Sequence, residues 1–167
     1  MIIRPENPGD EAAIHSVTEL AFAGHPHSDG SEPLIVDRLR KAGALAFSVV
    51  AEEEGKILGH AAFSRVQISD GAADWYGLGP VSVHPQRQGE GIGSALIRKG
   101  LDELRAIGAK GCVVAGDPAY YGRFGFNRND ELVLPDFPPD YFMALALHGS
   151  MASGIVTYHK AFYGDTA

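Results

Sequence analysis

Residues 84–96 read HPQRQGEGIGSAL and place three glycines, Gly89, Gly91 and Gly93, at the start of a predicted helix. Each glycine costs a helix roughly 1 kcal/mol relative to alanine, so helix stability does not explain them. A helix N-terminus carries unpaired backbone N–H groups and a partial positive charge, which together bind phosphate. Glycines remove the side chains that would keep a phosphate away from those groups. The stretch therefore predicts an anion site.

Two known phosphate-binding motifs do not match this stretch. The dinucleotide pattern G-x-G-x-x-G, begun at Gly89, needs glycine at the position of Ser94. The P-loop ends in Gly-Lys-Ser/Thr, which occurs nowhere in the sequence. The pattern that is present is Gln88-x-x-Gly91-x-Gly93, preceded by the strand-like run GPVSV and followed by an apolar helix. This order of strand, loop and helix is the context that a phosphate loop needs.

The Gln88 to Ser94 signature resembles motif A of the GNAT superfamily of N-acetyltransferases, which bind the pyrophosphate of acetyl-CoA. A second motif agrees, because residues 121–126, YGRFGF, resemble the Y-x-x-x-G-F element of that family. The order of predicted elements over residues 2–126 also matches the family fold. The ending, with YFMALAL and GIVTYHKAF, resembles a subgroup of uncharacterised bacterial members.

The resemblance implies which residues bind acetyl-CoA as a cosubstrate. The pyrophosphate is expected on the backbone N–H groups of Gln88, Gly89, Glu90, Gly91, Ile92, Gly93 and Ser94. Val81 and Val83, on the strand before the loop, pair their backbone with the pantetheine arm as though it were another strand. Gly79 and Pro80 weaken that strand and can open a slot for the arm. Arg87 is either a ligand of a cofactor phosphate or a solvated surface charge.

The implied reaction transfers an acetyl group from the thioester to a primary amine by direct attack in a ternary complex. It passes through a tetrahedral intermediate, with no covalent enzyme intermediate. The amine must be neutral to attack, and a lysine-like amine has a pKa of about 10.4, so a base or a desolvating pocket must remove its proton. The resemblance assigns the oxyanion donor to a backbone N–H on the strand ending at Val83, because Pro80 has none.

The catalytic side chains have one candidate acid and two candidate bases. Tyr121 matches the family's general-acid position, and a phenol is protonated at neutral pH. Its alternative role is core packing beside Tyr120, itself interpreted as packing or a pocket wall. Glu32 begins the predicted second helix, which lines the acceptor site in this fold, and is either the base or a residue that favours a helix N-terminus. His60, on a predicted strand, is either the base or a structural histidine.

Composition disfavours several other functions. The formal net charge of −7 argues against a nucleic-acid partner and suits a cationic small-molecule or peptide amine. The single cysteine, Cys112, excludes an internal disulfide and fits a reducing compartment. His25 and His27 share a loop but lack a third ligand, so we expect no metal.

The length of 167 residues predicts a single domain over residues 1–167. The longest mostly apolar stretch, residues 42–51, is shorter than the ~18 residues that suggest a membrane span. The N-terminal residues lack a basic start followed by an apolar run. We therefore expect a cytoplasmic protein with no membrane partner. The oligomeric state stays open, with a homodimer as one alternative.

Residue spacing predicts three long helices. The first has Asn7 as N-cap and runs from Pro8 to about Phe22, and the second follows Ser31 and ends at Gly43. The inward-facing residues of the second helix are expected to be Leu34, Ile35 and Leu39. The third helix covers residues 91–108.

Strand-like runs are interleaved with these helices. An antiparallel hairpin is expected over residues 46–68 around a turn at 54–56, and Asp117 with Pro118 opens a short helix. Further strand-like runs are expected at residues 74–85, 110–116, 141–147 and 154–160. Such alternation indicates a mixed α/β or α+β sheet. The resemblance specifies the GNAT fold, with a mostly antiparallel sheet, splayed middle strands and helices on both faces.

Two other functions remain open at this level. One is a non-catalytic CoA-binding regulatory or interaction module, which acetyl transfer to an amine would exclude. The other is a protein that binds a nucleotide other than CoA, which the mismatched motifs disfavour. The acceptor, the base and the acyl preference are not determined. Acceptor selectivity is expected in residues 24–32 and 127–140. Gly116-Asp117-Pro118 departs from the family, many members of which carry an asparagine there.

Overall fold

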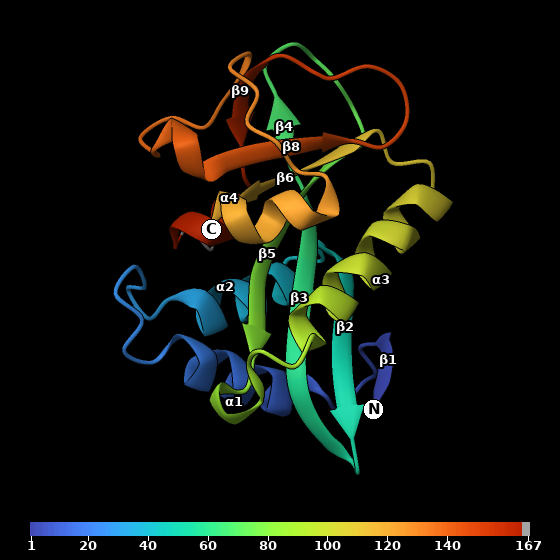
Figure 1. Ribbon diagram of the computed structural model, residues 1–167, viewed down its shortest axis with the longest axis vertical. Coiled ribbons are helices and arrows are strands. Elements are labelled where there is room, and N and C mark those ends of the chain that lie inside the picture. The colour runs from blue at the N-terminus through green and yellow to red at the C-terminus, as the bar shows by residue number, and fades with distance from the viewer. Residues whose placement is uncertain (165–167) are drawn as a thin grey trace.

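The computed structural model describes residues 1–164. Its main sheet has six strands in the order β1-β2-β3-β5-β6-β8 (Figure 1). Their bounds are β1 Ile2–Pro5, β2 Leu45–Glu53, β3 Lys56–Arg65, β5 Trp75–Val83, β6 Gly111–Ala115 and β8 Phe142–Ala146. Within this sheet β5 and β6 are parallel, and the other neighbouring strands are antiparallel. The predicted mixed and mostly antiparallel sheet is confirmed.

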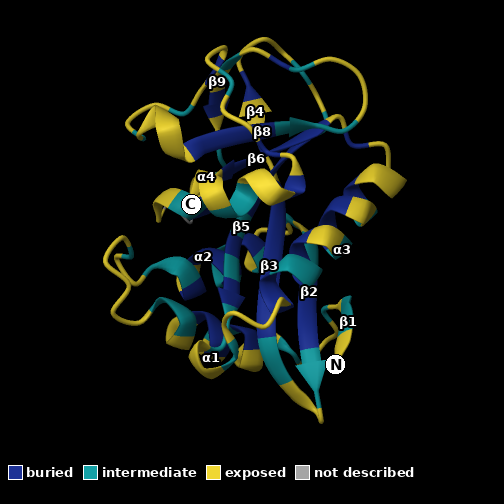
Figure 2. Cartoon of the chain, in the orientation of Figure 1, coloured by how far each residue is buried: buried dark blue, intermediate teal, exposed yellow. Residues whose placement is uncertain are grey.

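Helices cover both faces of this sheet, as predicted. The helices are α1 Glu11–Phe22, α2 Glu32–Lys41, α3 Ile92–Ala106 and α4 Pro118–Tyr121, with short 3-10 turns at Pro85–Arg87, Gly122–Phe124, Pro139–Tyr141 and Lys160–Tyr163. Phe63 on β3 belongs to the apolar cluster that α3 covers, whereas Val50 on β2 packs with Ile14 of α1 and Val36 of α2. In Figure 1, α3 and α4 lie in front of the strands and α1 and α2 behind them. Figure 2 shows that the strands between these layers are mostly buried.

A second, three-stranded sheet packs against the half of the main sheet that contains β5, β6 and β8. Its strands are β4 Gln67–Ile68, β9 Gly154–Thr157 and β7 Leu132–Val133, in the order β4-β9-β7. The predicted 46–68 strand pair is therefore correct only as far as Arg65, because Gln67–Ile68 pairs with β9 instead. The reason is a separate apolar cluster, in which Val66 and Val156 pack with Trp75 of β5. The β4-β9-β7 sheet forms the layer that buries this cluster.

The first helix begins later than its residue pattern predicts. Asn7 is not the N-cap, because residues 7–10 form a turn in which the Asp10 amide donates to the Asn7 carbonyl at 3.1 Å. Gly9 within that turn has φ +101°, a left-handed conformation that does not continue a right-handed helix. Arg4 holds the turn by pairing with Asp10 at 2.7 Å. Asp10 is consequently the residue that precedes α1.

The second helix has the predicted bounds but a different buried face. It begins after Ser31, and Gly43 follows its end with φ +68°. Leu34, which we expected to face inward, is 46% exposed, whereas Val36 is fully buried. At 100° per residue, Val36 lies closer to the buried Leu39 than Leu34 does, so Leu34 falls outside the apolar stripe.

The predicted separation of the middle strands arises from a bulge in β5. Ala61 of β3 faces Val81 of β5, but Phe63 faces Leu78, so β5 carries one extra residue near Gly79. β5 then pairs with β6 only from Trp75 to Leu78. Beyond Leu78 the two strands part. This splay leaves the last residues of β5 with one edge unpaired by the sheet.

Close contact between α3 and the sheet depends on Gly100. A Cβ at this position would overlap the ring of the buried Phe63. Gly100→Ala gains roughly 1 kcal/mol of helix propensity, but overpacking a core costs about 1–3 kcal/mol. We therefore expect a net loss of up to about 2 kcal/mol in the free energy of unfolding, measured by urea denaturation.

Two companion variants make this expectation specific. Lys99→Ala, at the neighbouring and more exposed position, should leave stability nearly unchanged. Adding Phe63→Leu should make room for the alanine, so Gly100→Ala should cost nothing further in that background. A Gly100→Ala protein more stable than the wild type would show that helix propensity outweighs the contact with Phe63.

Candidate active site at the parted strands

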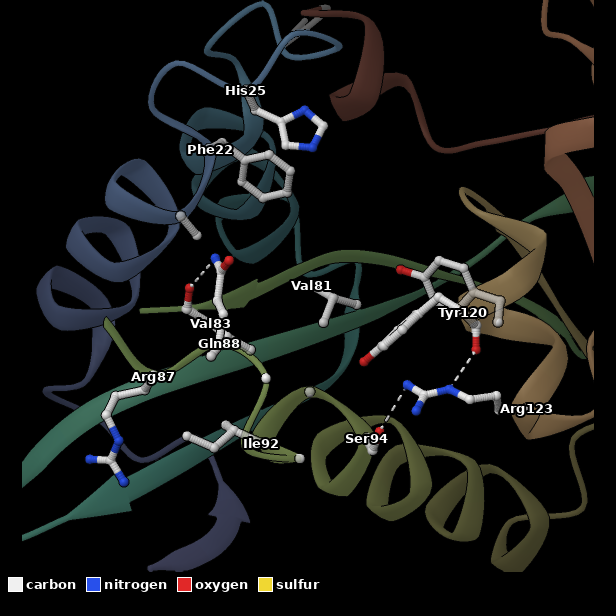
Figure 3. Close-up of a pocket in the computed structure, with 15 residues that line it drawn as sticks. Phe22, His25, Val81, Val83, Arg87, Gln88, Ile92, Ser94, Tyr120 and Arg123 are labelled. Carbon is white, nitrogen blue, oxygen red and sulfur yellow. Dashed lines mark hydrogen bonds between the residues drawn. The ribbon is translucent and has the colours of Figure 1, made fainter. Parts of the chain in front are cut away.

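A cavity of about 440 Å³ opens where β5 and β6 part (Figure 3). Four segments contribute: the end of α1, the parted half of β5, the glycine loop with the first turn of α3, and α4 with the turn after it. The lining residues are Ala21, Phe22, His25, Val81, Val83, Arg87, Gln88, Gly89, Gly91, Ile92, Gly93, Ser94, Tyr120, Tyr121 and Arg123. Because α1 covers one face of the sheet and α3 and α4 the other, the cavity passes from face to face.

The glycine loop presents free backbone N–H groups to this cavity. No hydrogen bond within residues 1–164 uses the amides of residues 88–94, whereas the Ala95 amide donates to the Gly91 carbonyl at 3.0 Å. Gly89 and Gly91 have φ +80° and +85°, which other residues rarely adopt. A Cβ added at either glycine would meet no protein atom within 4 Å, so the space beside the loop is open. The loop therefore fits a diphosphate.

The edge of β5 next to the cavity also has backbone groups available. The His84 amide donates to Leu58 of β3 at 2.8 Å, and hydrogen-bonded and non-hydrogen-bonded pairs alternate along an antiparallel ladder. Val81 and Val83 therefore occupy the non-hydrogen-bonded positions, with their backbone groups directed away from β3. The Val83 carbonyl accepts a hydrogen bond from Gln88 Nε2 at 3.1 Å. An extended ligand can pair with Val81 directly and with the Val83 carbonyl in place of Gln88.

Tyr120 and Arg123 form the wall opposite β5. The Tyr120 hydroxyl packs over Gly93, where a Cβ would lie 2.6 Å from it. The Arg123 guanidinium lies over the Tyr120 ring, with Cζ 4.5 Å from the ring centroid. Arg123 also donates to Ser94 Oγ at 3.3 Å and to the Tyr120 carbonyl at 3.2 Å (Figure 3). Arg123 is not among the predicted site residues, although a cation inside the YGRFGF motif is a signal that could have identified it.

Tyr121 lies in the cavity wall with most of its side chain buried. Burial raises the pKa of its phenol above the ordinary value, and neighbouring Tyr120 and Asp117 raise it further. The phenol is therefore protonated throughout the neutral range and can donate a proton or a hydrogen bond.

Neither candidate base lines the cavity. Glu32 lies at the start of α2, where its carboxylate accepts a hydrogen bond from Ser28 at 2.6 Å. His60 is fully buried on the α1 side of the sheet, and its Nε2 lies 2.8 Å from Ser48 Oγ, which donates to Glu6 at 2.6 Å. Burial lowers the pKa of His60 to about 4, so the imidazole is neutral at pH 7.

Phe22 and His25 enter the cavity from the end of α1, on the other side of the sheet from α3. Their ring centroids are 6.1 Å apart. The His27 amide donates to His25 Nδ1 at 3.3 Å, so the neutral imidazole carries its hydrogen on Nε2 and offers a donor. His25 belongs to the 24–32 segment in which acceptor selectivity is expected, although its side chain was considered individually only as a metal ligand. Residues 127–140, expected to share in acceptor selectivity, contribute nothing to the lining.

Charged groups around the cavity are distributed unevenly. Arg87 is held by Glu53 at 2.6 Å and by Glu90 at 3.0 Å, and these partners raise its pKa. Glu90 itself does not line the cavity, and neither does any other described carboxylate.

Among residues 1–164, no group of three His, Cys, Asp or Glu side chains could hold a metal ion. No helix in the same range is long and apolar enough to cross a membrane.

A sheet that parts beside a glycine-lined helix N-terminus, with a cavity through the gap, defines an acyltransferase domain with a phosphate-bearing donor. Residues 13–126 match the family described as Acetyltransferase (GNAT) family. The chain is 33% identical to the Escherichia coli (strain K12) protein named Uncharacterized N-acetyltransferase YhbS, over 97% of this chain and 98% of that protein. The chain therefore belongs to the acetyltransferase (GNAT) family and is an acetyltransferase, as the resemblance predicted.

Two solved structures agree with this assignment. A GNAT family acetyltransferase from Brucella melitensis, in complex with acetyl-CoA, is 52% identical with a TM-score of 0.86, covering 96% of this chain and 97% of that one. The Escherichia coli YhbS protein in complex with CoA is 30% identical with a TM-score of 0.88, covering 97% of this chain and 91% of that one. These two structural relatives thus contain acetyl-CoA or CoA, the ligand that the family resemblance implies for the glycine loop.

Proposed function

We propose that this protein transfers the acetyl group of acetyl-CoA to a primary amine on a small molecule or peptide, by direct attack in a ternary complex. The observation that carries the proposal is the cavity, which joins the glycine loop on one face of the sheet to the end of α1 on the other. Such a passage lets donor and acceptor reach one point from opposite sides. The acetyl-CoA complex of the 52% identical Brucella melitensis protein supports the choice of donor.

On the donor side, the chain supplies mainly backbone groups. The free amides of residues 88–94 bind the diphosphate, aided by the positive end of the α3 dipole. The outward groups of Val81 and Val83 pair with the pantetheine arm. Gln88 releases the Val83 carbonyl when the arm binds. The loop amides and the backbone groups of Val81 are in place before the ligand arrives, which limits the entropy lost on binding.

At the reacting carbonyl, one backbone N–H on the strand ending at Val83 donates to the developing oxyanion instead of pairing with the arm. Tyr121 gives its proton to the departing sulfur, a role for which its raised pKa keeps the phenol protonated. The acceptor enters beside Phe22 and His25.

Of the two candidate bases, Glu32 is the one we retain. It lies on the α1–α2 side where the acceptor enters, and because it does not line the cavity it would act through water. His60 is enclosed within the fold, and a side chain with no exposed surface cannot exchange protons readily with an acceptor. Family membership also removes the reason to favour a non-catalytic CoA-binding module.

The experiment that tests this function is release of free CoA thiol from acetyl-CoA across a panel of primary amines, including polyamines, amino sugars and peptides. We expect amine-dependent thiol release and a mass increase of one acetyl group on the accepted amine. Binding of acetyl-CoA without acetylation of any amine in the panel would contradict the proposed reaction while leaving the donor site intact.

Tyr121→Phe tests the role of the phenol. We expect kcat to fall by ~10- to 100-fold, near the lower end of the range for general acids, because a thiol of pKa about 8.5 leaves tolerably well unaided. The KM for acetyl-CoA should stay nearly constant, since the ring remains. Tyr120→Phe is the matched control and should retain most of kcat. Equal kcat for Tyr121→Phe and the wild type would remove Tyr121 from the mechanism.

A further inference from the structure

Two neighbouring arginines have no carboxylate partner within residues 1–164: Arg123, which lines the cavity just after α4, and Arg98 on α3, which packs on the same Phe124 ring. The other exposed arginines, Arg65, Arg105 and Arg128, are paired with aspartates, and the half-buried Arg87 is paired with two glutamates. The protein as a whole carries a net charge of −7, so acidic groups are abundant. Two neighbouring guanidinium groups that lack a carboxylate partner in the described part of an acidic protein indicate a binding site for an anion from a ligand.

Aromatic rings and neutral acceptors hold the two guanidinium groups. Arg98 Cζ lies 5.0 Å and Arg123 Cζ 5.5 Å from the centroid of the Phe124 ring. Arg123 also contacts Ser94 Oγ and the Tyr120 carbonyl. Contacts of this kind orient a guanidinium but leave its charge uncompensated. Both groups are therefore positioned and still able to bind an anion.

The location of the pair relative to the glycine loop limits what the anion can be. Ser94 and Arg98 are four residues apart and share one face of α3, so Arg98 lies about one turn, roughly 6 Å, beyond the end of the amide loop. Arg123 is on the other side of the loop from Arg87 (Figure 3). The diphosphate of coenzyme A is accounted for by the amides of residues 88–94. The molecule carries one further anion, the 3′-phosphate on its ribose.

We propose that Arg98 and Arg123 form the subsite for this 3′-phosphate and make the protein select coenzyme A over dephospho-CoA. The inference rests on the proposed function, because it requires the diphosphate on the glycine loop. Arginine suits the role, since its planar fork of donors can bind two oxygens of a phosphate at once. Phe124 positions the pair, because both guanidinium groups pack on its ring.

The test compares coenzyme A with dephospho-CoA, which differ only by the 3′-phosphate. Dissociation constants are measured by titration calorimetry for the wild type, Arg98→Gln, Arg123→Gln and the double variant. Arg105→Gln is the matched control, since Arg105 is also on α3 but pairs with Asp102. Thermal unfolding confirms that each variant is folded.

We expect the wild type to bind coenzyme A at least about tenfold more tightly than dephospho-CoA. Each substitution should weaken binding of coenzyme A several-fold while leaving dephospho-CoA unaffected, and the double variant should bind both ligands equally. Arg105→Gln should keep the wild-type preference. Arg123→Lys, which retains the charge but not the fork, should keep part of it.

Three results would overturn the subsite. In the first, the wild type binds coenzyme A and dephospho-CoA equally tightly. In the second, the substitutions weaken binding of both ligands equally. In the third, they weaken binding of neither ligand. Equal weakening would place the arginines on the diphosphate or in a structural role. All three leave the proposed function standing, because coenzyme A still binds. Failure of the wild type to bind either ligand would instead contradict the proposed function itself.

Discussion

Gly91→Val should raise the dissociation constant for acetyl-CoA by ~100-fold or more. Gly91 precedes α3 with φ +85° and lines the cavity, and a Cβ there would project into open space. Valine would therefore stand where the diphosphate binds, and its β-branch would disfavour the left-handed backbone that aims the amides. A hydrogen bond to a charged group contributes about 1.5–3 kcal/mol, so losing two exceeds a hundredfold. Titration calorimetry measures the change.

Gly108→Val is the matched control for this experiment. Gly108 follows the other end of α3 with φ +78°, and a Cβ there also meets open space, but it does not line the cavity. Both substitutions should cost similar stability, about 1–2 kcal/mol of backbone strain. Only Gly91→Val should lose the ligand. Binding within a few-fold of the wild type for Gly91→Val would show that the diphosphate does not use these amides.

The protein should lose about 3 kcal/mol of stability between pH 7 and pH 4 through His60 alone. The unfolded chain binds a proton at a histidine below about pH 6.5, whereas burial in the folded protein lowers the pKa of His60 to about 4. Over this interval the unfolded state holds more protons, so stability rises with pH and is lost on acidification. The lowering of the pKa corresponds to about 3 kcal/mol.

His60→Gln isolates this contribution. Glutamine does not titrate and can still donate to Ser48, which His60 Nε2 contacts at 2.8 Å. Urea denaturation of both proteins from pH 7 to pH 4 should give a shallower pH dependence for the variant, by about 3 kcal/mol across the range. The titration of carboxylates that do not interact with His60 is common to the two proteins and cancels in the difference, whereas Glu6 is coupled to His60 and its response is part of the measured contribution. If stability falls equally with pH in the two proteins, the pKa of His60 does not differ between the folded and unfolded states, and the predicted contribution is absent.

The sequence was sufficient for features that depend on local residue types. The glycine pattern before α3 predicted a loop with open backbone amides at the helix N-terminus, and Gly89 and Gly91 indeed have the left-handed φ that favours residues without side chains. Asp117 and Pro118 predicted α4, and the Asp117 carboxylate indeed accepts from the Ala119 amide at 3.0 Å. Gly79 and Pro80 predicted the weak point of β5, since neither residue supports a regular ladder.

Other features required contacts between distant parts of the chain. Val66 continues an apolar run by sequence, yet its side chain belongs to the cluster under a second sheet that no local pattern specifies. The start of α1 depends on the ion pair between Arg4 and Asp10, and the buried face of α2 depends on its angle to α1 and β2.

Site membership divides in the same way. Residue type and motif predicted Tyr121 and the glycine loop as parts of one site, and both line the cavity, because a motif fixes its own geometry along the chain. His60 and Glu32 were selected by residue type alone. Only the packed structure shows that His60 is fully buried and that Glu32 does not line the cavity. The pairing of Arg98 with Arg123 around Phe124 likewise arises from packing. Local sequence sets backbone conformation, but which side chains share a space is decided by how the layers pack.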